Sequence, residues 1–132
     1  VAMALREQRL IIDIEEEAGY LGDILWSSEA LGNIIKNSVE HTPPGGEIHI
    51  KGSENTIYTE IVVEDNGKGI DPEDIPHLFE RFYRGKNSSS NSIGIGLALA
   101  RMIVTEQNGT IKVENRREGG ARFVIRFYKG VV

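Results

Sequence analysis

The feature that most constrains this chain is a run of three β-branched residues leading straight into two acids and two glycines, ending in the stretch VVEDNGKGI. Ile61, Val62 and Val63 break the alternation of apolar and polar residues, which predicts a strand covered on both faces. Ligands of sheet proteins often lie just beyond the end of such a strand, where short polar groups can reach them. The chain is therefore expected to build a buried sheet with a polar cleft at the end of this strand.

The remaining segments read as strands and helices. Leu10 and its neighbours alternate in a short strand within residues 9–17, and the helix after it begins at a capping Ser28 and ends at the prolines of residues 41–46. Two strands are predicted within 47–65, joined by a turn near 52–55, and are followed by short helical turns at 71–84 capped by Asp71. A polar loop at 85–92 then leads to a helix at 96–109, which Asn108 and Gly109 end. The last predicted elements are two strands within 110–128 around a turn at 118–120. This order predicts one sheet with helices on a single face, an α+β sandwich of two layers.

Length and charge exclude several classes of function. The 132 residues fit a single domain, 1–132, with one core. A net charge of −5 argues against a nucleic-acid partner, because such a partner requires a basic surface. The chain has no cysteine, which excludes disulfides, thiolate metal sites and cysteine nucleophiles. No apolar run approaches the roughly 18 residues of a membrane span, so any membrane anchor is expected outside this chain.

Two asparagines stand four residues apart on the predicted helix. Asn33 and Asn37 therefore lie on the same side of it, away from the apolar face. An amide oxygen is a hard ligand that suits Mg²⁺ bridged to phosphates. Taken alone, the pair is better explained as two surface asparagines. Glu40 and His41 follow one turn later and could line the same cleft.

The acid at the end of the constrained strand is a candidate for reading a base. The Asp65 carboxylate can accept a hydrogen bond from an exocyclic amine such as that of adenine, and Gly67 and Gly69 let the backbone approach a flat ring or turn sharply. A polar turn after a strand explains the same residues when the stretch is considered alone.

The stretch LFERFYRG spaces its apolar side chains like one helix face. Such a stripe is usually core, so Phe79 and Phe82 are expected to be buried. Arg81 and Arg84 differ, because a guanidinium can pair with phosphate oxygens.

A second glycine pair, Gly94 and Gly96, comes immediately before a helix. Free N–H groups and the positive end of the helix dipole make such a start a phosphate site, although glycines also permit close helix packing. The pattern is not a dinucleotide-binding fingerprint, because no strand leads into it and the third glycine is missing.

Together and in this order, four stretches resemble the catalytic and ATP-binding domain of sensor histidine kinases, in the ATPase superfamily shared with gyrase B, MutL proteins and a heat-shock chaperone. NIIKNSVEHTPPGG looks like the N box, EDNGKGI like the first glycine box, LFERFYR like the phenylalanine box and GIGLALAR like the second glycine box. The resemblance covers roughly residues 9–128. It implies the Bergerat ATP-binding fold, a mixed and mostly antiparallel sheet with helices on one face.

The resemblance also implies roles for individual residues. Asn37 matches the magnesium ligand, Asn33 an amide at the phosphates, Asp65 the acid that reads adenine, and Arg84 an arginine that reaches the phosphates; Asn33, Asn37 and Arg84 would be the catalytic group. Residues 85–93 would be the ATP lid. The full set of implied contacts to ATP is Asn33, Asn37, His41, Asp65, Gly67, Gly69, Ile70, Phe79, Phe82, Arg84, Gly94, Ile95, Gly96 and Leu97.

This sequence departs from the family pattern at three positions. Glu40 and His41 stand where the family often has lysine and tyrosine, so Glu40 should not take over the phosphate contact of that lysine. Ser92 occupies the position where the second glycine box commonly begins.

The resemblance finally implies phosphoryl transfer from Mg·ATP to a histidine. The hydrolase branches carry a glutamate at the position of Asn33, and an amide is no general base at neutral pH. His41, His49 and His77 do not match the family's acceptor box, so the dimerisation and phosphoacceptor domain is expected on a separate segment, and the chain alone is expected not to phosphorylate itself.

The implied setting is a cytoplasmic domain of a membrane-anchored sensor. The isolated domain would be a monomer, the full-length protein a homodimer, and the next partner a response regulator. Two alternatives remain open. A serine-directed kinase of anti-sigma-factor type would be expected to lack LFERFYR, and a docking module without catalysis would have lost Asn37 or Asp65.

Overall fold

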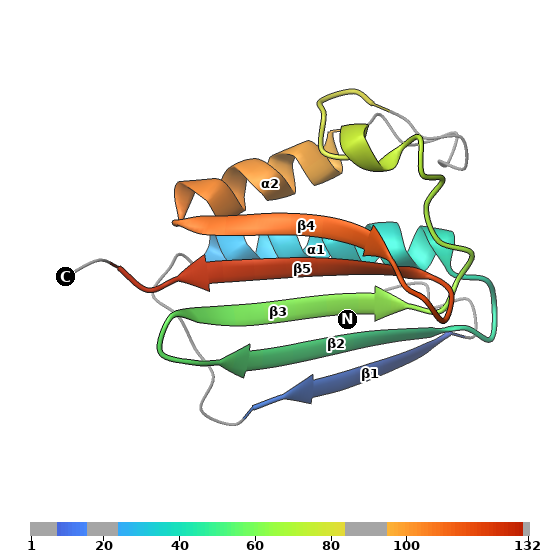
Figure 1. The fold of residues 1–132 in the computed structure, drawn as a ribbon, viewed down its shortest axis with the longest axis horizontal. Coiled ribbons are helices and arrows are strands. Elements are labelled where there is room, and N and C mark those ends of the chain that lie inside the picture. The colour runs from blue at the N-terminus through green and yellow to red at the C-terminus, as the bar shows by residue number, and fades with distance from the viewer. Residues whose placement is uncertain (1–7, 16–23, 84–94, 131–132) are drawn as a thin grey trace.

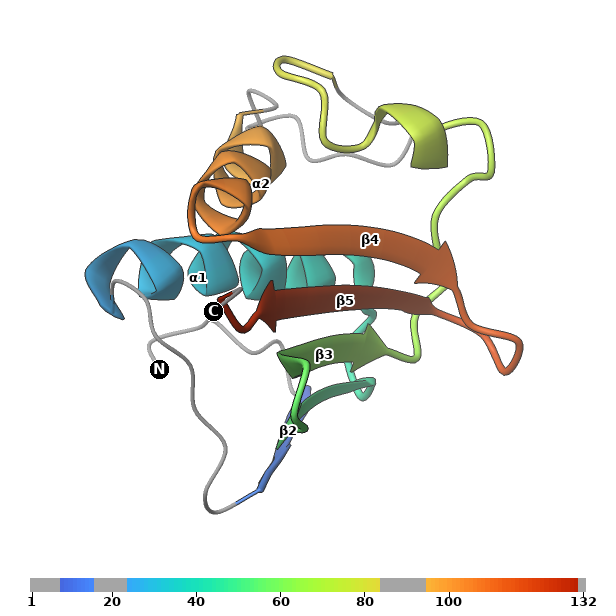
Figure 2. The same ribbon diagram turned by 60° about the vertical axis from the view of Figure 1, so that its left-hand side comes forward.

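The computed structural model describes residues 8–15, 24–83 and 95–130. A five-stranded sheet carries two α-helices on one face, as Figures 1 and 2 show from two sides. The elements are β1 (Arg9–Ile14), α1 (Ile24–His41), β2 (Glu47–Glu54), β3 (Tyr58–Asp65), a 3₁₀ turn (Ile75–His77), α2 (Gly96–Glu106), β4 (Gly109–Asn115) and β5 (Ala121–Tyr128). The predicted α+β sandwich of two layers is confirmed.

The sheet is mixed and has the strand order β1-β2-β3-β5-β4. β1 runs parallel to β2, and the other neighbours pair antiparallel. The central place of β3 agrees with its apolar sequence. Its carboxyl end, at Asp65, lies at the same end of the sandwich as the end of α1 and the start of α2 (Figure 1).

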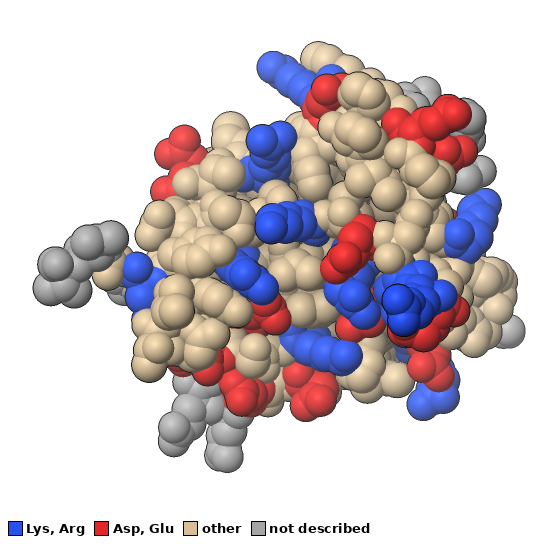
Figure 3. All heavy atoms as spheres, viewed as in Figure 1, with Lys and Arg blue, Asp and Glu red and all other residues tan. Residues whose placement is uncertain are grey.

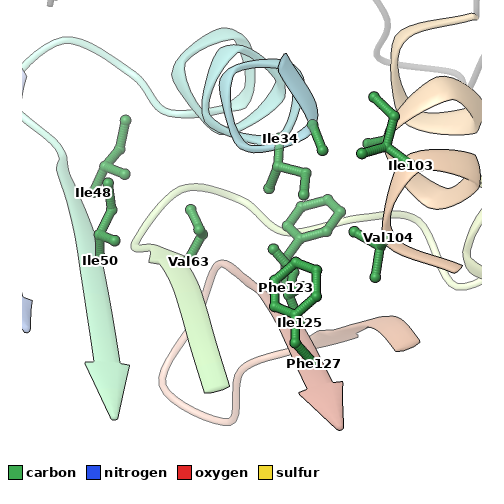
Figure 4. Packing of buried hydrophobic residues seen from close by; sticks show 11 residues of the cluster. Ile34, Ile48, Ile50, Val63, Ile103, Val104, Phe123, Ile125 and Phe127 are labelled. Carbon is green, nitrogen blue, oxygen red and sulfur yellow. The ribbon is translucent and has the colours of Figure 1, made fainter. Parts of the chain in front are cut away.

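The core lies between the sheet and the helices, as Figure 4 shows. Side chains alternate along each strand, so every second residue faces the helices. These core residues include Ile48, Ile50, Val63, Phe123, Ile125 and Phe127 from the sheet and Ile34, Ile103 and Val104 from the helices. Burial of each such side chain stabilises the fold by about 1.5–3 kcal/mol relative to exposure, which makes this layer the main source of stability.

The opposite face of the sheet carries charged side chains of both signs, spread over the strands in Figure 3. No second layer covers it within the described residues, so the expectation that both faces of β3 are buried was wrong. Val62 lies on this face beside its strand partner Val124, and both are only partly buried. The three β-branched residues therefore reflect a central strand rather than a third layer.

The most buried charge on this open face is Glu64. Its carboxylate lies 3.0 Å from Lys51 Nζ, 3.1 Å from Arg116 Nε and 3.4 Å from Arg122 Nη2. Burial alone would raise the pKa of Glu64, but Lys51 and Arg122 outweigh it and the pKa lies below its ordinary value. The cluster ties β2, β5 and the β4–β5 turn to β3.

Several element boundaries differ from the sequence-based expectations. α1 begins at Ile24, four residues before the expected cap. Ser28, the expected cap, therefore lies inside α1. The preceding Ser27 Oγ accepts a hydrogen bond from Gln107 Nε2 at 3.1 Å, which joins α1 to the end of α2. β1 ends at Ile14; residues 16 and 17 of the predicted strand lie outside the described residues.

The predicted helix at 96–109 ends earlier, at Glu106. Asn108 adopts a left-handed conformation with φ of 61° and pairs with β5: its carbonyl accepts the Tyr128 N–H at 3.0 Å and its side chain donates to the Tyr128 carbonyl at 3.1 Å. Asn108 is thus the left-handed residue of the stop signal, and Gly109 already belongs to β4.

None of the helices in the described part of the chain combines the length and the apolar character needed to cross a membrane.

Candidate functional site

One side of α1 carries three polar side chains in a line. Asn33, Asn37 and His41 follow each other at four-residue steps and are each partly buried. Their backbone positions span about 12 Å along the helix, at a rise of 1.5 Å per residue. The predicted placement of Asn33 and Asn37 on one side is confirmed, and His41 extends the line toward the end of the helix.

The carboxylate of Asp65 lies at the base of this end of the sandwich and is 2 % exposed. Its Oδ1 accepts hydrogen bonds from the N–H groups of Gly67 at 3.0 Å and Ala121 at 3.3 Å. Neither bond uses Oδ2. Burial raises the pKa of Asp65 above its ordinary value, although these two N–H groups, His41 and Arg116 oppose the rise. The site therefore holds a poorly solvated acid whose second oxygen can accept a further donor.

Gly67 brings this acid against the end of α1. A Cβ at Gly67 would lie 2.4 Å from the carbonyl oxygen of His41 and 3.2 Å from Asp65 Oδ1, so no side chain fits there. The His41 ring is fixed as well, because Nδ1 lies 2.8 Å from the Asn37 carbonyl oxygen. A carbonyl oxygen only accepts, so Nδ1 carries the proton and donates, and Nε2 is the nitrogen that remains for a ligand.

The opposite end of the polar line meets the start of α2. A Cβ at Gly96 would lie 3.7 Å from Asn33 Cγ, which is ordinary contact, so the two stretches are direct neighbours. Asn33 Nδ2 is buried and has no hydrogen-bond partner among the described residues. Ile95 precedes α2 without a side-chain cap, and Leu97 is partly buried in its first turn. An unpaired amide beside free helix N–H groups suits an anionic ligand.

The phenylalanine stretch divides into a partly buried and an exposed part. Phe79 packs edge-on against Phe123, with ring centroids 6.2 Å apart and planes at 77°. Phe82 is 62 % exposed, so the expectation that it is buried was wrong. Its backbone has φ of 67°, and the Arg81 guanidinium lies 4.8 Å from the centre of its ring.

The following residue explains this outward turn. The Tyr83 hydroxyl donates to the carboxylate of Asp74, which raises the pKa of Tyr83 to about 12. Asp74 is itself buried, and the chain therefore bends at Phe82 to bring Tyr83 back to it.

Several residues around Asp65 were not identified from the sequence. A Cβ at Gly120 would lie 1.9 Å from the Asp65 carbonyl oxygen, and the guanidinium of Arg116 donates to that same oxygen at 2.7 Å. Asn115 bonds the backbone of Ile70, which follows Gly69. The sequence carried a signal for the turn at 118–120, but not for its contact with Asp65, because the partners are distant along the chain.

Some predicted site residues lie outside the described residues: Arg84, Gly94 and the lid at 85–93. Among the described residues no three His, Asp or Glu side chains gather into a metal site. Asn37 fits Mg²⁺ only as one oxygen ligand among several, in the way this ion is held together with phosphate oxygens and water.

Comparison with known proteins places these features in a family. The sequence model of the histidine kinase-, DNA gyrase B-, and HSP90-like ATPases matches residues 22–130. Sensor histidine kinase YvrG of Bacillus subtilis is 39 % identical over 117 residues, covering 87 % of this chain and 20 % of YvrG. Sensor histidine kinase YclK of the same species is 34 % identical over 125 residues, covering 92 % of this chain and 26 % of YclK. The chain thus spans about a fifth to a quarter of these relatives.

Solved structures agree with the fold. The mycobacterial sensor histidine kinase MprB matches with a TM-score of 0.85 at 24 % identity, covering 94 % of this chain and 85 % of that one. The catalytic domain of histidine kinase ThkA matches with a TM-score of 0.81 at 25 % identity, covering 94 % and 81 %.

Proposed function

The chain belongs to the family of histidine kinase-, DNA gyrase B- and HSP90-like ATPases, and from this membership we propose that it binds Mg·ATP and donates the γ-phosphoryl group to a histidine on a separate phosphoacceptor domain. One observation carries the proposal: the polar line of α1 runs from Gly96 at the start of α2 to Gly67 beside Asp65. Its length of about 12 Å suits an elongated ligand with an anionic group at one end and a base at the other.

The base end is Asp65. Oδ1 is held by two backbone N–H groups, so Oδ2 accepts the exocyclic amine of adenine. Guanine offers a carbonyl oxygen in place of that amine, and a carboxylate repels it. Gly67, Gly69 and Ile70 form the adjoining wall.

The phosphate end is formed by Asn33 and the first turn of α2. The buried Nδ2 of Asn33 gains a phosphate oxygen as acceptor, and the N–H groups at Gly96 and Leu97 add further donors. Asn37, one turn along, would hold Mg²⁺ through its amide oxygen, and a bound Mg²⁺ neutralises charge on the phosphates. Arg84 would add a guanidinium to this end.

Transfer to a protein is favoured over hydrolysis. Asn33 stands one turn before Asn37, and its amide cannot take a proton from water at neutral pH. The matched relatives YvrG and YclK are sensor histidine kinases. The corresponding partners would be a dimeric phosphoacceptor domain and a response regulator, with the chain on the cytoplasmic side of a membrane-anchored sensor and monomeric when isolated.

None of the three histidines of the chain lies in a stretch that matches the family's acceptor box. His41 forms part of the polar line of α1, His77 lies in the 3₁₀ turn with its Nδ1 2.9 Å from Glu80 Oε1, and the Nε2 of His49 is buried on the opposite face of the sheet from the site. We therefore propose that residues 1–132 form one nucleotide-binding domain whose acceptor histidine lies on another domain.

The test is incubation with γ-labelled ATP and Mg²⁺, with and without a purified histidine-containing phosphoacceptor domain. The proposal expects base-stable, acid-labile label on the added domain only. Label on a histidine of the 132-residue chain would contradict the separate acceptor, and acid-stable label on serine would favour a serine-directed kinase. Absence of ATP-dependent thermal stabilisation at millimolar ATP would favour a docking module.

A further inference from the structure

An asparagine on the edge strand β4 clamps the loop that follows Asp65. Asn115 is the last residue of β4, and β5 separates that strand from β3 in the sheet. Its Oδ1 accepts the N–H of Ile70 at 2.7 Å, and its Nδ2 donates to the Ile70 carbonyl at 2.7 Å. One side-chain amide thus binds both polar groups of a single residue, as a neighbouring strand would.

The clamp acts on a part of the loop that is rich in glycine. Gly67 and Gly69 lie between Asp65 and Ile70, and glycine has the largest conformational freedom of any residue. Gly69 has φ of 81°, and a Cβ there would lie 2.8 Å from Asn115 Oδ1. The amide therefore rests directly on the glycine backbone, and Ile70 is held buried behind it.

We propose that Asn115 is a positioning residue for the base of the nucleotide. By fixing Gly69 and Ile70 it keeps the wall of the pocket at a set distance from the Asp65 carboxylate before the ligand arrives. The inference rests on the proposed function, because it takes the space beside Asp65 as the adenine pocket. Asn115 itself acts through Ile70 and need not touch the ligand.

The residue just before the same strand offers a matched control. Asn108 precedes β4 as Asn115 ends it, and its side chain also bonds a backbone carbonyl, that of Tyr128, at 3.1 Å. Asn108→Gly removes this bond and retains the left-handed conformation that Asn108 adopts with φ of 61°. Asn108 precedes the start of β4, which lies at the end of the sheet away from the carboxyl end of β3 (Figure 1).

The experiment measures the affinity of the 132-residue chain for Mg·ATP and for inorganic triphosphate with Mg²⁺ by titration calorimetry. Asn115→Ala should weaken ATP binding about tenfold, the equivalent of one ordinary hydrogen bond, and leave triphosphate binding unchanged. Asn115→Asp should weaken ATP binding at least as much, because its second oxygen would face the Ile70 carbonyl. Asn108→Gly should change neither affinity.

Other results overturn the inference. Equal weakening of ATP and triphosphate by Asn115→Ala would mean general damage to the domain, and unchanged ATP affinity in either Asn115 variant would mean that the clamp does not position the pocket. Asp65→Asn separates this failure from that of the proposed function. If Asp65→Asn weakens ATP binding while Asn115→Ala does not, only the inference is wrong. If Asp65→Asn binds ATP normally, or the unaltered chain does not bind triphosphate, the proposed site itself is wrong.

Discussion

The carboxylate of Asp65 accepts a hydrogen bond from the backbone N–H of Ala121, at 3.3 Å, although the two residues lie on neighbouring strands far apart in sequence. This bond makes the start of β5 part of the site that the end of β3 forms. The carboxyl group of Asp65 is nevertheless buried, and this burial raises its pKa above the ordinary value. The acid should therefore be useful for binding and unfavourable for stability.

The first prediction separates these two effects with Asp65→Asn. ATP affinity should fall roughly 10- to 100-fold, the range for a lost hydrogen bond to a charged group. Stability at pH 7 should not fall, because the amide oxygen of the variant can still accept hydrogen bonds from the N–H groups of Gly67 and Ala121, and the variant buries no charge.

A group whose pKa is raised by folding holds its proton more tightly in the folded state, so its contribution to stability falls as pH rises through that pKa. The stability gain of the variant should thus be largest at neutral pH and shrink toward pH 4. Thermal unfolding across this range is the measurement, and a lower melting temperature at pH 7 would contradict the prediction.

Glu64 and Glu60 provide the second prediction, since both pair with arginine on the open face. Glu64 is buried among three cations, whereas Glu60 pairs with Arg126 at 2.8 Å with both side chains partly exposed. Glu64→Gln should destabilise the fold by about 1.5–3 kcal/mol, because the buried carboxylate loses its charged hydrogen bonds to Lys51 and Arg122. Glu60→Gln should change stability by less than about 1 kcal/mol.

The pH dependence expected for Glu64 has the opposite sign from that of Asp65. The pKa of Glu64 lies below its ordinary value of 4.5, so its contribution is present above that value and is lost as pH falls through the lowered pKa. Urea unfolding at pH 7 and at pH 3 measures both effects, and the Glu64→Gln deficit should shrink at pH 3. Equal effects of the two variants at pH 7 would show that burial of Glu64 does not matter.

The third prediction compares two glycines. Gly120 has φ of 90° and stands against the Asp65 carbonyl oxygen, whereas a Cβ at Gly32, on the exposed side of α1, would meet nothing within 4 Å. Gly120→Ala should destabilise the chain by about 3 kcal/mol or more, through strain and displacement of Asp65. Gly32→Ala should stabilise it by about 0.5–1 kcal/mol, because alanine favours a helix. Denaturant titration measures the free energy of unfolding of both variants. An unchanged free energy in Gly120→Ala would mean that the β4–β5 turn is not fixed to Asp65.

The fourth prediction concerns Asn37. Asn37→Ala should remove the part of ATP binding that depends on Mg²⁺ and retain the part measured in its absence, because the adenine contacts at Asp65 are unchanged. Lys36→Ala, one residue earlier and exposed, should retain both. The measurement is the rise in melting temperature that ATP causes, compared in the presence of Mg²⁺ and in the presence of a chelator. Unchanged Mg²⁺ dependence in Asn37→Ala would exclude Asn37 as the ligand.

Periodicity in the sequence was enough to predict the two-layer sandwich and the shared side of Asn33 and Asn37, because both depend only on local spacing. It failed where a distant partner decides. α1 extends upstream of the expected cap Ser28, where Ser27 bonds Gln107 at the end of α2, and Phe82 turns outward because Tyr83 binds Asp74. Both partners become visible only once the chain is folded.

Asn115 shows the same limit within the site. A strand-ending asparagine carries no local signal for a role, and its partner Ile70 belongs to another segment. The sequence could indicate that Asp65 and the glycines after it form a pocket, but not which residues hold that pocket in shape.

The most direct test of the account is a crystal structure of the chain with Mg²⁺ and a non-hydrolysable ATP analogue. The account predicts the adenine amine within hydrogen-bond distance of Asp65 Oδ2, Mg²⁺ bound by the amide oxygen of Asn37, and phosphate oxygens at Asn33 and Gly96. An adenine ring bound away from Asp65, or phosphates away from the start of α2, would contradict it.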